Sequence, residues 1–379
     1  MFENTKRFCD SFLERGLPGF DLAVYKGGEC ILRHMNGYSD LENGVKINGK
    51  ERYNIYSCSK IITCVAAMQL WEKGLFSLED KLSKYLPEFE NMTVKGELGV
   101  REAKNPILIK HLFEMTAGFT YNTNSENMLA ARAVRNGGCT TREAMTHLAK
   151  DPLAFEPGER WEYSLCHDVL AAVVEVISGE RFEDYVKKNI FDPLRMNDST
   201  FMLPEKELDT IAEQYRFENK KPTNVGKNIV TYKLGSAYAS GGAGCISTVD
   251  DYMKFLEAIR VGDVILKRET IQLMATPRLT AEQERTYWTK DTHGYGLGMR
   301  CPRGDKRYLD YGWGGAAGAL LAVDPENELS IYFGTHLLNS PVQGMRSMIY
   351  RFVKAELLGE DFADIERELT SFYNYKLTY

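Results

Sequence analysis

The sequence has no apolar stretch long enough to cross a membrane and no cluster of basic residues. Even the apolar run Val169 to Ile177 is interrupted by Glu175, whereas a spanning helix needs about 20 predominantly apolar residues. Lys and Arg number 47 against 53 Asp and Glu, which gives a net charge of −6. A nucleic-acid surface requires clustered positive charge. We therefore expect neither a membrane nor a nucleic acid as a partner.

Cysteine and histidine do not occur in the spacings that bind metal. The eight cysteines form no C-x-x-C pair and the six histidines form no H-x-x-x-H pair, so we expect no metal and no cofactor. The segment Met1 to Arg7 lacks the apolar region of a secretory signal. Scattered thiols without an export signal are typical of a reducing compartment. We therefore expect a cytoplasmic protein, most simply a bacterial one.

The two ends of the chain carry the strand signals. Two β-prone runs, 22–25 and 30–33, flank Gly27-Gly28 and predict a hairpin. Three further strands are expected near the C-terminus, at 308–311, 319–323 and 329–333.

The middle of the chain shows helical spacing. Helices are expected from Ser57 to Gly74, at 105–113, 141–149, 169–177 and 252–259, and a closing one at 342–358. Strands at both ends with helices between them predict an α+β fold. In this arrangement residues 1–75 and 238–379 form one antiparallel sheet domain with flanking helices, residues 76–237 form an inserted, mainly helical lobe, and the active site lies between them.

The segment Ile55-Tyr56-Ser57-Cys58-Ser59-Lys60 has the form S-x-x-K and opens an apolar run. A serine hydroxyl is a poor nucleophile and needs a neighbouring group to accept its proton. At a helix start, this spacing places Lys60 one turn along on the same face as Ser57, beside N–H groups that can bind an oxyanion. In isolation, the same spacing is typical of an N-capping serine followed by a solvated lysine.

Further motifs follow in a fixed order, at 111–119, 155–164, 241–251 and 312–318. With them the chain resembles the serine β-lactamase and penicillin-binding-protein superfamily, most closely the carboxylesterase members of its class C-like branch. The resemblance covers about 21–335 and implies a serine β-lactamase-like fold and an acyl-enzyme mechanism.

Three catalytic residues follow from the resemblance. It implies that Ser57 is the acylated serine, Lys60 its lysine partner and Tyr163 the tyrosine of the Y-x-N motif. Either Lys60 as a neutral amine or Tyr163 as a phenolate could then accept the proton of Ser57. Without the other motifs, Tyr163 would read as a core aromatic residue.

The chain departs from the β-lactamase pattern at two positions. The K-T-G motif is replaced by Trp313-Gly314-Gly315, and the third residue of Y-x-N is Leu165. A cation for a substrate carboxylate and an amide for a substrate carbonyl are thus missing. Both replacements add apolar surface, which favours an esterase that acts on small esters.

The resemblance also implies an oxyanion hole from the backbone N–H groups of Ser57 and Ala316. Gly314 and Gly315 permit a substrate to approach the strand closely. Tyr121 aligns with a loop that often carries a pocket side chain in this branch. A nucleotide-binding glycine loop is excluded at 312–318 because a strand is expected after it rather than a helix.

Several alternatives remain beside a carboxylesterase. They are a β-lactamase, a D-amino-acid peptidase or amidase, an acyltransferase, and a catalytically inactive penicillin-recognition sensor. A triad through His167 and Asp168 is disfavoured because no G-x-S-x-G elbow frames a serine. The expected partner is a small-molecule ester or amide, and the sequence gives no oligomeric state.

Overall fold

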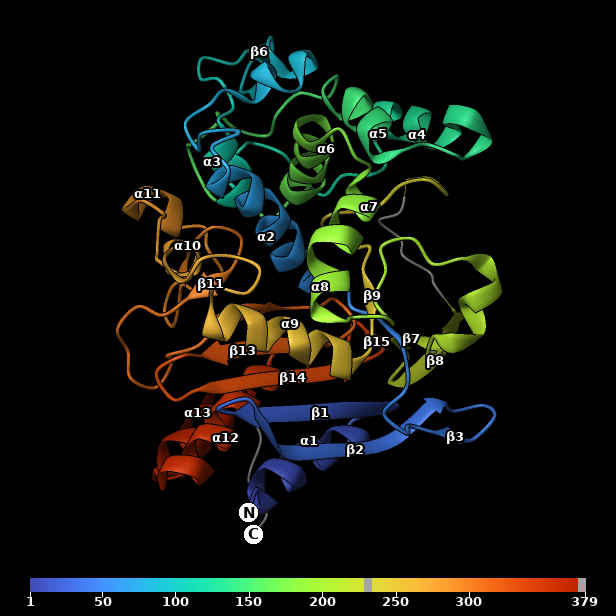
Figure 1. Ribbon diagram of the computed structural model, residues 1–379, viewed down its shortest axis with the longest axis vertical. Coiled ribbons are helices and arrows are strands. Elements are labelled where there is room, and N and C mark those ends of the chain that lie inside the picture. Colours follow the sequence, from blue (N-terminus) through green and yellow to red (C-terminus); the bar gives the residue numbers. More distant parts are fainter. Residues whose placement is uncertain (228–233, 374–379) are drawn as a thin grey trace.

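The computed structural model describes residues 1–227 and 234–373 of the chain (Figure 1). Within these residues, an eight-stranded sheet forms the base of the molecule and a mainly helical part lies above it. The first and the last described helices both lie at the base, where blue and red elements meet. The predicted α+β fold is confirmed.

The large sheet is built from both ends of the chain. Its strands are β1 (Gly19–Lys26), β2 (Glu29–Asp40), β3 (Val45–Lys46), β10 (Gly294–Tyr295), β11 (Arg300–Cys301), β12 (Tyr311–Gly314), β13 (Leu320–Asp324) and β14 (Leu329–Thr335). They follow the order β10-β11-β12-β13-β14-β1-β2-β3. Strand β1 pairs antiparallel with β14, with Ala23 opposite Tyr332, and it also pairs antiparallel with β2. The predicted hairpin is therefore present and supplies the strand that joins the two chain ends.

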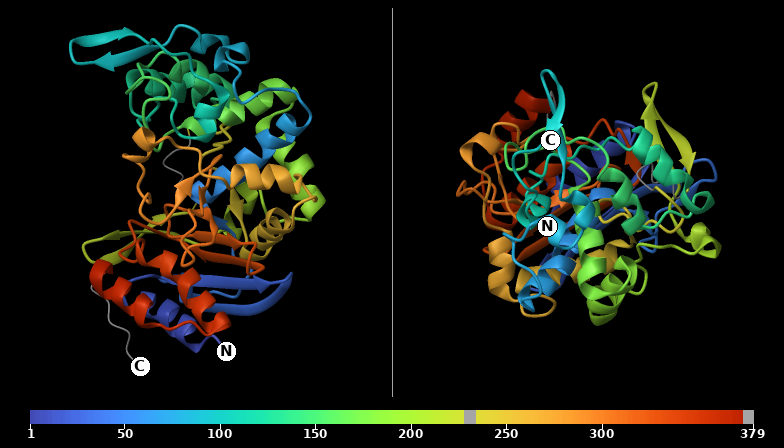
Figure 2. Two further views of the ribbon diagram at one scale, coloured as in Figure 1. Left: turned by 90° about the vertical axis from the view of Figure 1, so that its left-hand side faces the viewer. Right: turned by 90° about the horizontal axis from the view of Figure 1, so that it is seen from above.

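Smaller strand pairs connect the loops above the sheet. They are β4 (Tyr53–Asn54) with β9 (Ile246–Ser247), β5 (Thr93–Gly96) with β6 (Gly99–Glu102), and β7 (Gln214–Glu218) with β8 (Lys221–Gly226) and β15 (Leu337–Leu338). The β5–β6 hairpin projects from the helical part, in cyan in the left view of Figure 2.

The helices cover both faces of the sheet and form the part above it. The α-helices are α1 (Glu3–Glu14), α2 (Ser59–Glu72), α3 (Ile109–Phe113), α4 (Glu126–Ala133), α5 (Thr141–Leu148), α6 (Cys166–Ser178), α7 (Phe182–Val186), α8 (Asp192–Leu194), α9 (Val249–Val261), α10 (Arg268–Met274), α11 (Ala281–Glu284), α12 (Met348–Leu358) and α13 (Ala363–Tyr373). Shorter helical turns are η1 (Tyr56–Cys58), η2 (Leu82–Lys84), η3 (Pro87–Phe89), η4 (Val134–Asn136), η5 (Lys187–Phe191), η6 (Glu205–Thr210) and η7 (Met345–Ser347).

The sheet is buried between helices. Helix α9 packs on β14, β1 and β13, while α1, α12 and α13 lie below the sheet in Figure 1. Phe8 of α1 stacks on Phe352 of α12, with ring centroids 4.4 Å apart, and Phe12 meets Phe333 of β14 edge-on. All seven residues of β14 are buried, as expected for a strand that is covered on both faces.

Helix α2 crosses the interior and positions the S-x-x-K motif. It packs against α6, and its residues from Ser59 to Met68 are all buried. A helix that is apolar on all sides belongs in a core. Its one buried cation, Lys60, is therefore held in place by protein on every side.

Each helix expected from the sequence is present, but α3 and α12 begin four and six residues later than expected, at Ile109 and Met348. Thr248 caps α9 by accepting from the backbone N–H of Asp251, and Gly179 ends α6 with a φ of 72°. The prediction of a strand at 308–311 is wrong for the first three positions, because β12 begins only at Tyr311. Asp310 precedes it and is buried in an ion pair with Arg300, so its segment is a loop that carries a charged side chain inward. Helices α1 and α13 were not predicted.

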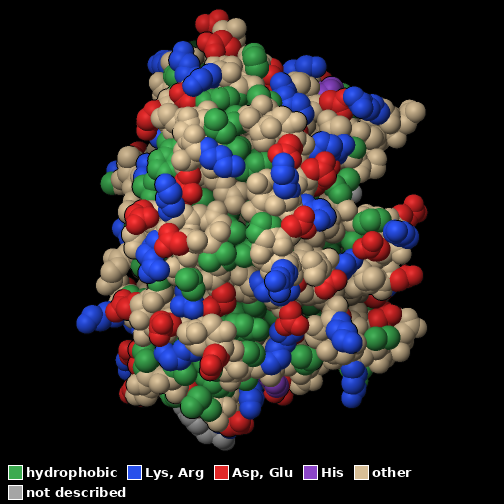
Figure 3. Space-filling model, in the orientation of Figure 1, with side chains coloured by type: hydrophobic (Ala, Val, Ile, Leu, Met, Phe, Trp, Pro, Cys, Tyr) green, Lys and Arg blue, Asp and Glu red, His purple; other side chains and the backbone are tan. Residues whose placement is uncertain are grey.

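The division into a sheet domain (1–75 and 238–379) and a helical lobe (76–237) remains a prediction. The strand pairs β5–β6 and β7–β8 lie within the lobe range, and positions 228–233 of that range lie outside the described residues. No helix in the described part of the chain is long and apolar enough to cross a membrane. On the face in Figure 3, acidic and basic side chains are interspersed.

Candidate active site

Ser57 lies in a tight turn just before α2. It is in the 3₁₀ turn η1, and α2 itself begins at Ser59. The preceding residue, Tyr56, is fully buried with a φ of +48°, a conformation that bulky side chains rarely adopt and that concentrates at functional sites. The backbone N–H of Ile55 donates to the carbonyl of Cys245. The side chain of Ser59 accepts from the N–H of Cys245 at 3.0 Å, so the turn is fixed on both sides.

Lys60 is fully buried and its amine meets three oxygen atoms. Its Nζ lies 3.4 Å from Ser57 Oγ, 2.6 Å from Tyr121 Oη and 2.7 Å from the carbonyl oxygen of Gly242. An ammonium group has three N–H donors and no acceptor, so these three oxygens satisfy a charged Lys60 completely. The spacing of S-x-x-K therefore brings the amine to the serine, as predicted.

The backbone beside Lys60 can be only glycine. A Cβ atom on Gly242 would collide with Asp168 Oδ2 and come within 3.3 Å of Lys60 Nζ. Asp168 is fully buried, and its Oδ1 accepts hydrogen bonds from Tyr238 and Ser240. Its Oδ2 has no hydrogen-bond partner among the described residues. A buried carboxylate thus lies across the Gly242 backbone from the lysine, where it offsets the positive charge.

Tyr163 lies over Lys60 and beside strand β12. Lys60 Nζ lies 4.5 Å from the centroid of the Tyr163 ring, and the ring stacks on that of Trp313 at 5.7 Å. The indole N–H of Trp313 donates to Tyr163 Oη at 3.4 Å. An indole N–H can only donate, so it stabilises negative charge on that oxygen.

These side chains line one pocket of about 470 Å³. A Cβ on Gly315 would lie 2.5 Å from the carbonyl of Ile55, so only glycine lets the strand end approach the Ser57 turn this closely. The pocket is lined by Ser57, Tyr121, Tyr163, Trp288, Thr289, Arg300, Trp313, Gly314, Gly315, Ala316, Gln343 and Arg346.

Two arginines in this lining were not predicted. Arg300 forms a buried ion pair with Asp310 and donates to the carbonyl of Trp313. Although burial opposes it, the guanidinium holds the pKa of Asp310 well below its usual range. Arg346 donates through Nη1 to the carbonyl of Gly315 at 2.7 Å. It comes from η7, the helical turn before α12.

Trp288 is the third residue that sequence reasoning missed. Its side chain is 64% exposed, and its ring centroid lies 4.9 Å from that of Tyr163 at the pocket. Trp288, Arg300 and Arg346 belong to no motif, and they reach the pocket only through long-range folding. No local signal in the sequence could have identified them.

The structure brings together all but one of the predicted site residues. Those that line the pocket are Ser57, Tyr121, Tyr163, Trp313, Gly314, Gly315 and Ala316, and Lys60 lies buried behind Ser57 and Tyr121. Leu165 is the exception and a correction, because it is fully buried in the core as the N-cap of α6. Its side chain has no surface to offer a substrate.

His167 lies outside the pocket. It is fully buried in α6, with Nε2 3.5 Å from Cys64 Sγ and close to the carbonyl of Phe113. Burial, assisted by the charge of Lys60, lowers the pKa of His167 to about 3. The absence of a His-based triad, expected from the sequence, agrees with this position.

Known proteins share both the fold and the sequence pattern. EstCE1, described as a hydrolase with promiscuous acyltransferase activity, superposes with a TM-score of 0.77 at 24% identity, over 92% of this chain and 97% of its own. Simvastatin synthase (LovD) from Aspergillus terreus gives a TM-score of 0.77 at 22% identity, over 93% and 97%. In sequence, esterase EstB from Burkholderia gladioli is 28% identical, over 89% of this chain and 90% of its own.

The model of the β-lactamase family matches residues 5–349, nearly the whole chain. The match includes the S-x-x-K turn, Tyr163 and strand β12 beside the pocket. The chain therefore belongs to the β-lactamase family.

Proposed function

We propose that the protein is a serine hydrolase that forms an acyl-enzyme on Ser57 and acts as a carboxylesterase on small esters. The observation that carries the proposal is the 3.4 Å contact between Lys60 Nζ and Ser57 Oγ inside a pocket of about 470 Å³. A hydroxyl beside a positioned amine at a pocket floor is the arrangement of an activated nucleophile.

Within this proposal, Tyr163 accepts the proton of Ser57. Lys60 has three acceptors for its three N–H donors and serves as the cation. The oxygen of Tyr163 accepts the indole N–H of Trp313, and the amine of Lys60 lies over its ring. Both contacts stabilise the negative charge that Tyr163 needs in order to accept a proton. With Lys60 donating to Ser57 Oγ, the serine O–H is left to donate to that base.

The reaction then proceeds in two halves. The Ser57 oxygen bonds to the ester carbonyl carbon, and the bond from that carbon to the alcohol oxygen breaks. The alcohol leaves with the proton that Tyr163 took from Ser57. Water next attacks the acyl-enzyme, gives its proton back through Tyr163 to Ser57, and releases the carboxylic acid. The N–H groups of Ser57 and Ala316 are proposed to bind the carbonyl oxygen as its charge develops.

The pocket lining supports an ester as the substrate. Trp313 replaces the cation of the β-lactamase motif, and the stacked rings of Tyr163 and Trp313 form an apolar wall. EstB, an esterase by name, is similar along nearly its whole length. We place the enzyme in the cytoplasm as part of this proposal, because all eight cysteines are free thiols.

Covalent labelling tests the proposal. A fluorophosphonate probe should label the protein once per molecule, which intact-mass spectrometry can show. Ser57→Ala should abolish this labelling and lower kcat by several orders of magnitude. Ser77→Ala, an exposed serine outside the pocket, is the matched control and should label normally. On a panel of 4-nitrophenyl esters, benzylpenicillin and nitrocefin, kcat/KM should be highest for short esters. Efficient turnover of benzylpenicillin would contradict the esterase assignment.

Acyl transfer is the second candidate. EstCE1, which shares the fold, is described as having promiscuous acyltransferase activity. If the acyl group passes to an alcohol rather than to water, added methanol should raise the rate of phenol release and yield a methyl ester. A product consisting only of free acid would leave hydrolysis as the activity.

A further inference from the structure

The pocket contains a cation with no anion of its own. Arg346 forms no ion pair with any residue that the structure describes, and its one hydrogen bond there goes to the neutral carbonyl of Gly315. The adjacent Arg300, by contrast, is paired with Asp310. A Cβ atom on Gly314 would collide with Arg346 Nη2, so the guanidinium lies directly against the strand that borders the substrate.

Arg346 is half-buried at the pocket wall, and a partly desolvated charge without a counter-ion is costly. Burial, together with the repulsion of Arg300, lowers the pKa of Arg346 to about 10. The group therefore stays protonated at neutral pH while lacking an anion. A guanidinium of this kind binds a carboxylate through two parallel N–H donors.

We infer that Arg346 binds a carboxylate on the alcohol half of the ester that the enzyme hydrolyses. The positive charge that Trp313 removes from β12 is thus supplied from η7, just before α12. This inference rests on the proposed esterase activity of Ser57 and narrows its substrates to esters whose leaving alcohol is an acid.

The position of Tyr163 decides which half of the ester carries the carboxylate. The group that protonates the leaving oxygen must lie within hydrogen-bond reach of it, so the alcohol half lies against Tyr163. Trp313 joins Tyr163 to this same wall. Arg346 lines the same pocket and lies directly against Gly314, the residue that follows Trp313. Trp288, 4.9 Å from the Tyr163 ring, suits an aromatic ring in the leaving group.

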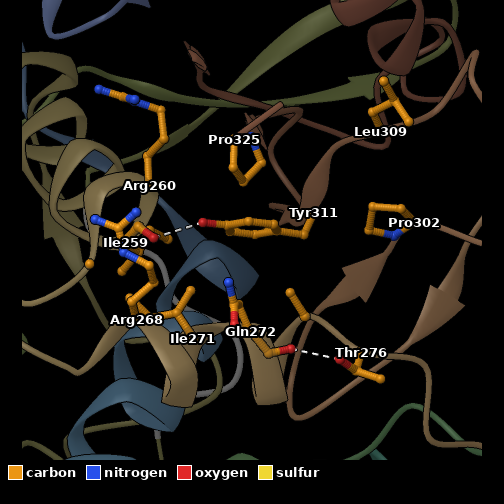
Figure 4. A pocket seen from close by; sticks show the side chains of 12 residues that line it. Ile259, Arg260, Arg268, Ile271, Gln272, Thr276, Pro302, Leu309, Tyr311 and Pro325 are labelled. Atoms are coloured by element: carbon orange, nitrogen blue, oxygen red, sulfur yellow. Dashed lines mark hydrogen bonds between the residues drawn. The ribbon is translucent and has the colours of Figure 1, made fainter. Parts of the chain in front are cut away.

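A second cavity provides the contrasting case and the control. It measures about 340 Å³ and lies beside α9, α10 and β12 (Figure 4). Arg260 there is held by Glu257 through two hydrogen bonds, and Tyr311 donates to the carbonyl of Ile259. Arg268 at the same cavity is 60% exposed, faces Asp263, and is not part of the lining of the Ser57 pocket. Its removal deletes one positive charge without touching the pocket of Ser57.

Paired substrates test the inference. 3-Acetoxybenzoate and its neutral amide, 3-acetoxybenzamide, differ only in the carboxylate, and their hydrolysis can be followed by chromatography of the phenols. The wild-type enzyme should prefer the acid by roughly ten- to a hundredfold in kcat/KM, the range for hydrogen bonds to a charged group. Arg346→Gln should abolish the preference, Arg346→Lys should keep part of it, and Arg268→Gln should preserve it in full.

The ratio of the two substrates separates recognition from damage to the strand. If Arg346 only supports Gly315, Arg346→Gln will lower both rates alike, the wild type will show no preference, and the inference is overturned. A binding measurement decides the matter even without turnover. On the Ser57→Ala protein, titration calorimetry should show 3-hydroxybenzoate binding at least tenfold more tightly than 3-hydroxybenzamide, and Arg346→Gln should remove the difference. Failure of every ester to react would reject the esterase proposal alone, and equal binding of acid and amide would reject the role of Arg346.

Discussion

The hydroxyl oxygen of Tyr121 lies 2.6 Å from Lys60 Nζ, closer than the oxygen of Ser57 at 3.4 Å. The tyrosine that the sequence places in a pocket loop is therefore a direct partner of Lys60. Together with the carbonyl of Gly242, it fixes the direction in which the amine points.

Tyr121→Phe should slow the chemical step. The change keeps the ring and removes one acceptor from a buried ammonium group, a loss of about 1.5–3 kcal/mol for a hydrogen bond to a charged group. We expect kcat to fall roughly tenfold or more while KM changes little. Steady-state kinetics on a 4-nitrophenyl ester provide the measurement, with thermal melting as a check on the fold. An unchanged kcat would show that Tyr121 has no part in holding Lys60.

Lys60 and Tyr163 should behave as one unit. Lys60→Ala removes the cation and Tyr163→Phe removes the base, so each should lower kcat by several orders of magnitude. The double variant should be little worse than either single one, because one proton pathway cannot be lost twice. A double-mutant cycle on kcat is the measurement. Fully additive effects would mean that the two groups act in separate steps.

How well the sequence predicts a site residue depends on how far apart the contacting residues lie in the sequence. Ser57 and Lys60 are three residues apart, so helical geometry alone predicts that they meet. Tyr163 and Ala316 reach the site over long stretches of chain, and only the order of motifs shared with a family identified them. The sheet formed by both ends was predictable because β1, β2, β13 and β14 each carry their own strand pattern.

Pocket residues that belong to no sequence motif could not be predicted, for a physical reason. Arg346 acquires its position because η7 packs against the end of β12, and that packing has no local signature. Leu165 shows the opposite error. Its place in the Y-x-N pattern suggested a pocket residue, but the start of α6 turns its side chain into the core.

Trp313→Phe should isolate the indole N–H. Phenylalanine retains an aromatic wall against Tyr163 but cannot donate to its oxygen, which now receives that bond at 3.4 Å. Because a bond of this length is weak, we expect kcat to fall about three- to tenfold. Trp313→Tyr, which also keeps an aromatic ring but lacks the indole N–H, should show a similar loss in kcat. An unchanged kcat in both variants would contradict charge stabilisation by the indole N–H.

Stability at acidic pH should depend on buried histidines, and His167 offers the sharpest test. Burial lowers the pKa of His111 and His336 to about 4 and that of His167 to about 3. As pH falls below about 6.5, the unfolded chain binds protons at these sites and the folded chain does not, so folding free energy is lost. The loss continues until the folded pKa is reached. At pH 5 it amounts to about 1–2 kcal/mol per histidine.

A matched comparison removes the contribution of other groups. Burial raises the pKa of Asp21 to about 6, and this carboxyl acts with the opposite sign between about pH 4 and 6. We therefore compare the wild-type protein with His167→Gln by urea unfolding at pH 7.5, 6 and 5, because Asp21 contributes equally to both. The variant removes a well-packed side chain and should be less stable at pH 7.5. Its deficit should shrink by about 1–2 kcal/mol at pH 5, since only the wild type still pays for keeping His167 uncharged. A deficit that stays constant across this range would mean that His167 is protonated inside the folded protein, and would contradict the depressed pKa.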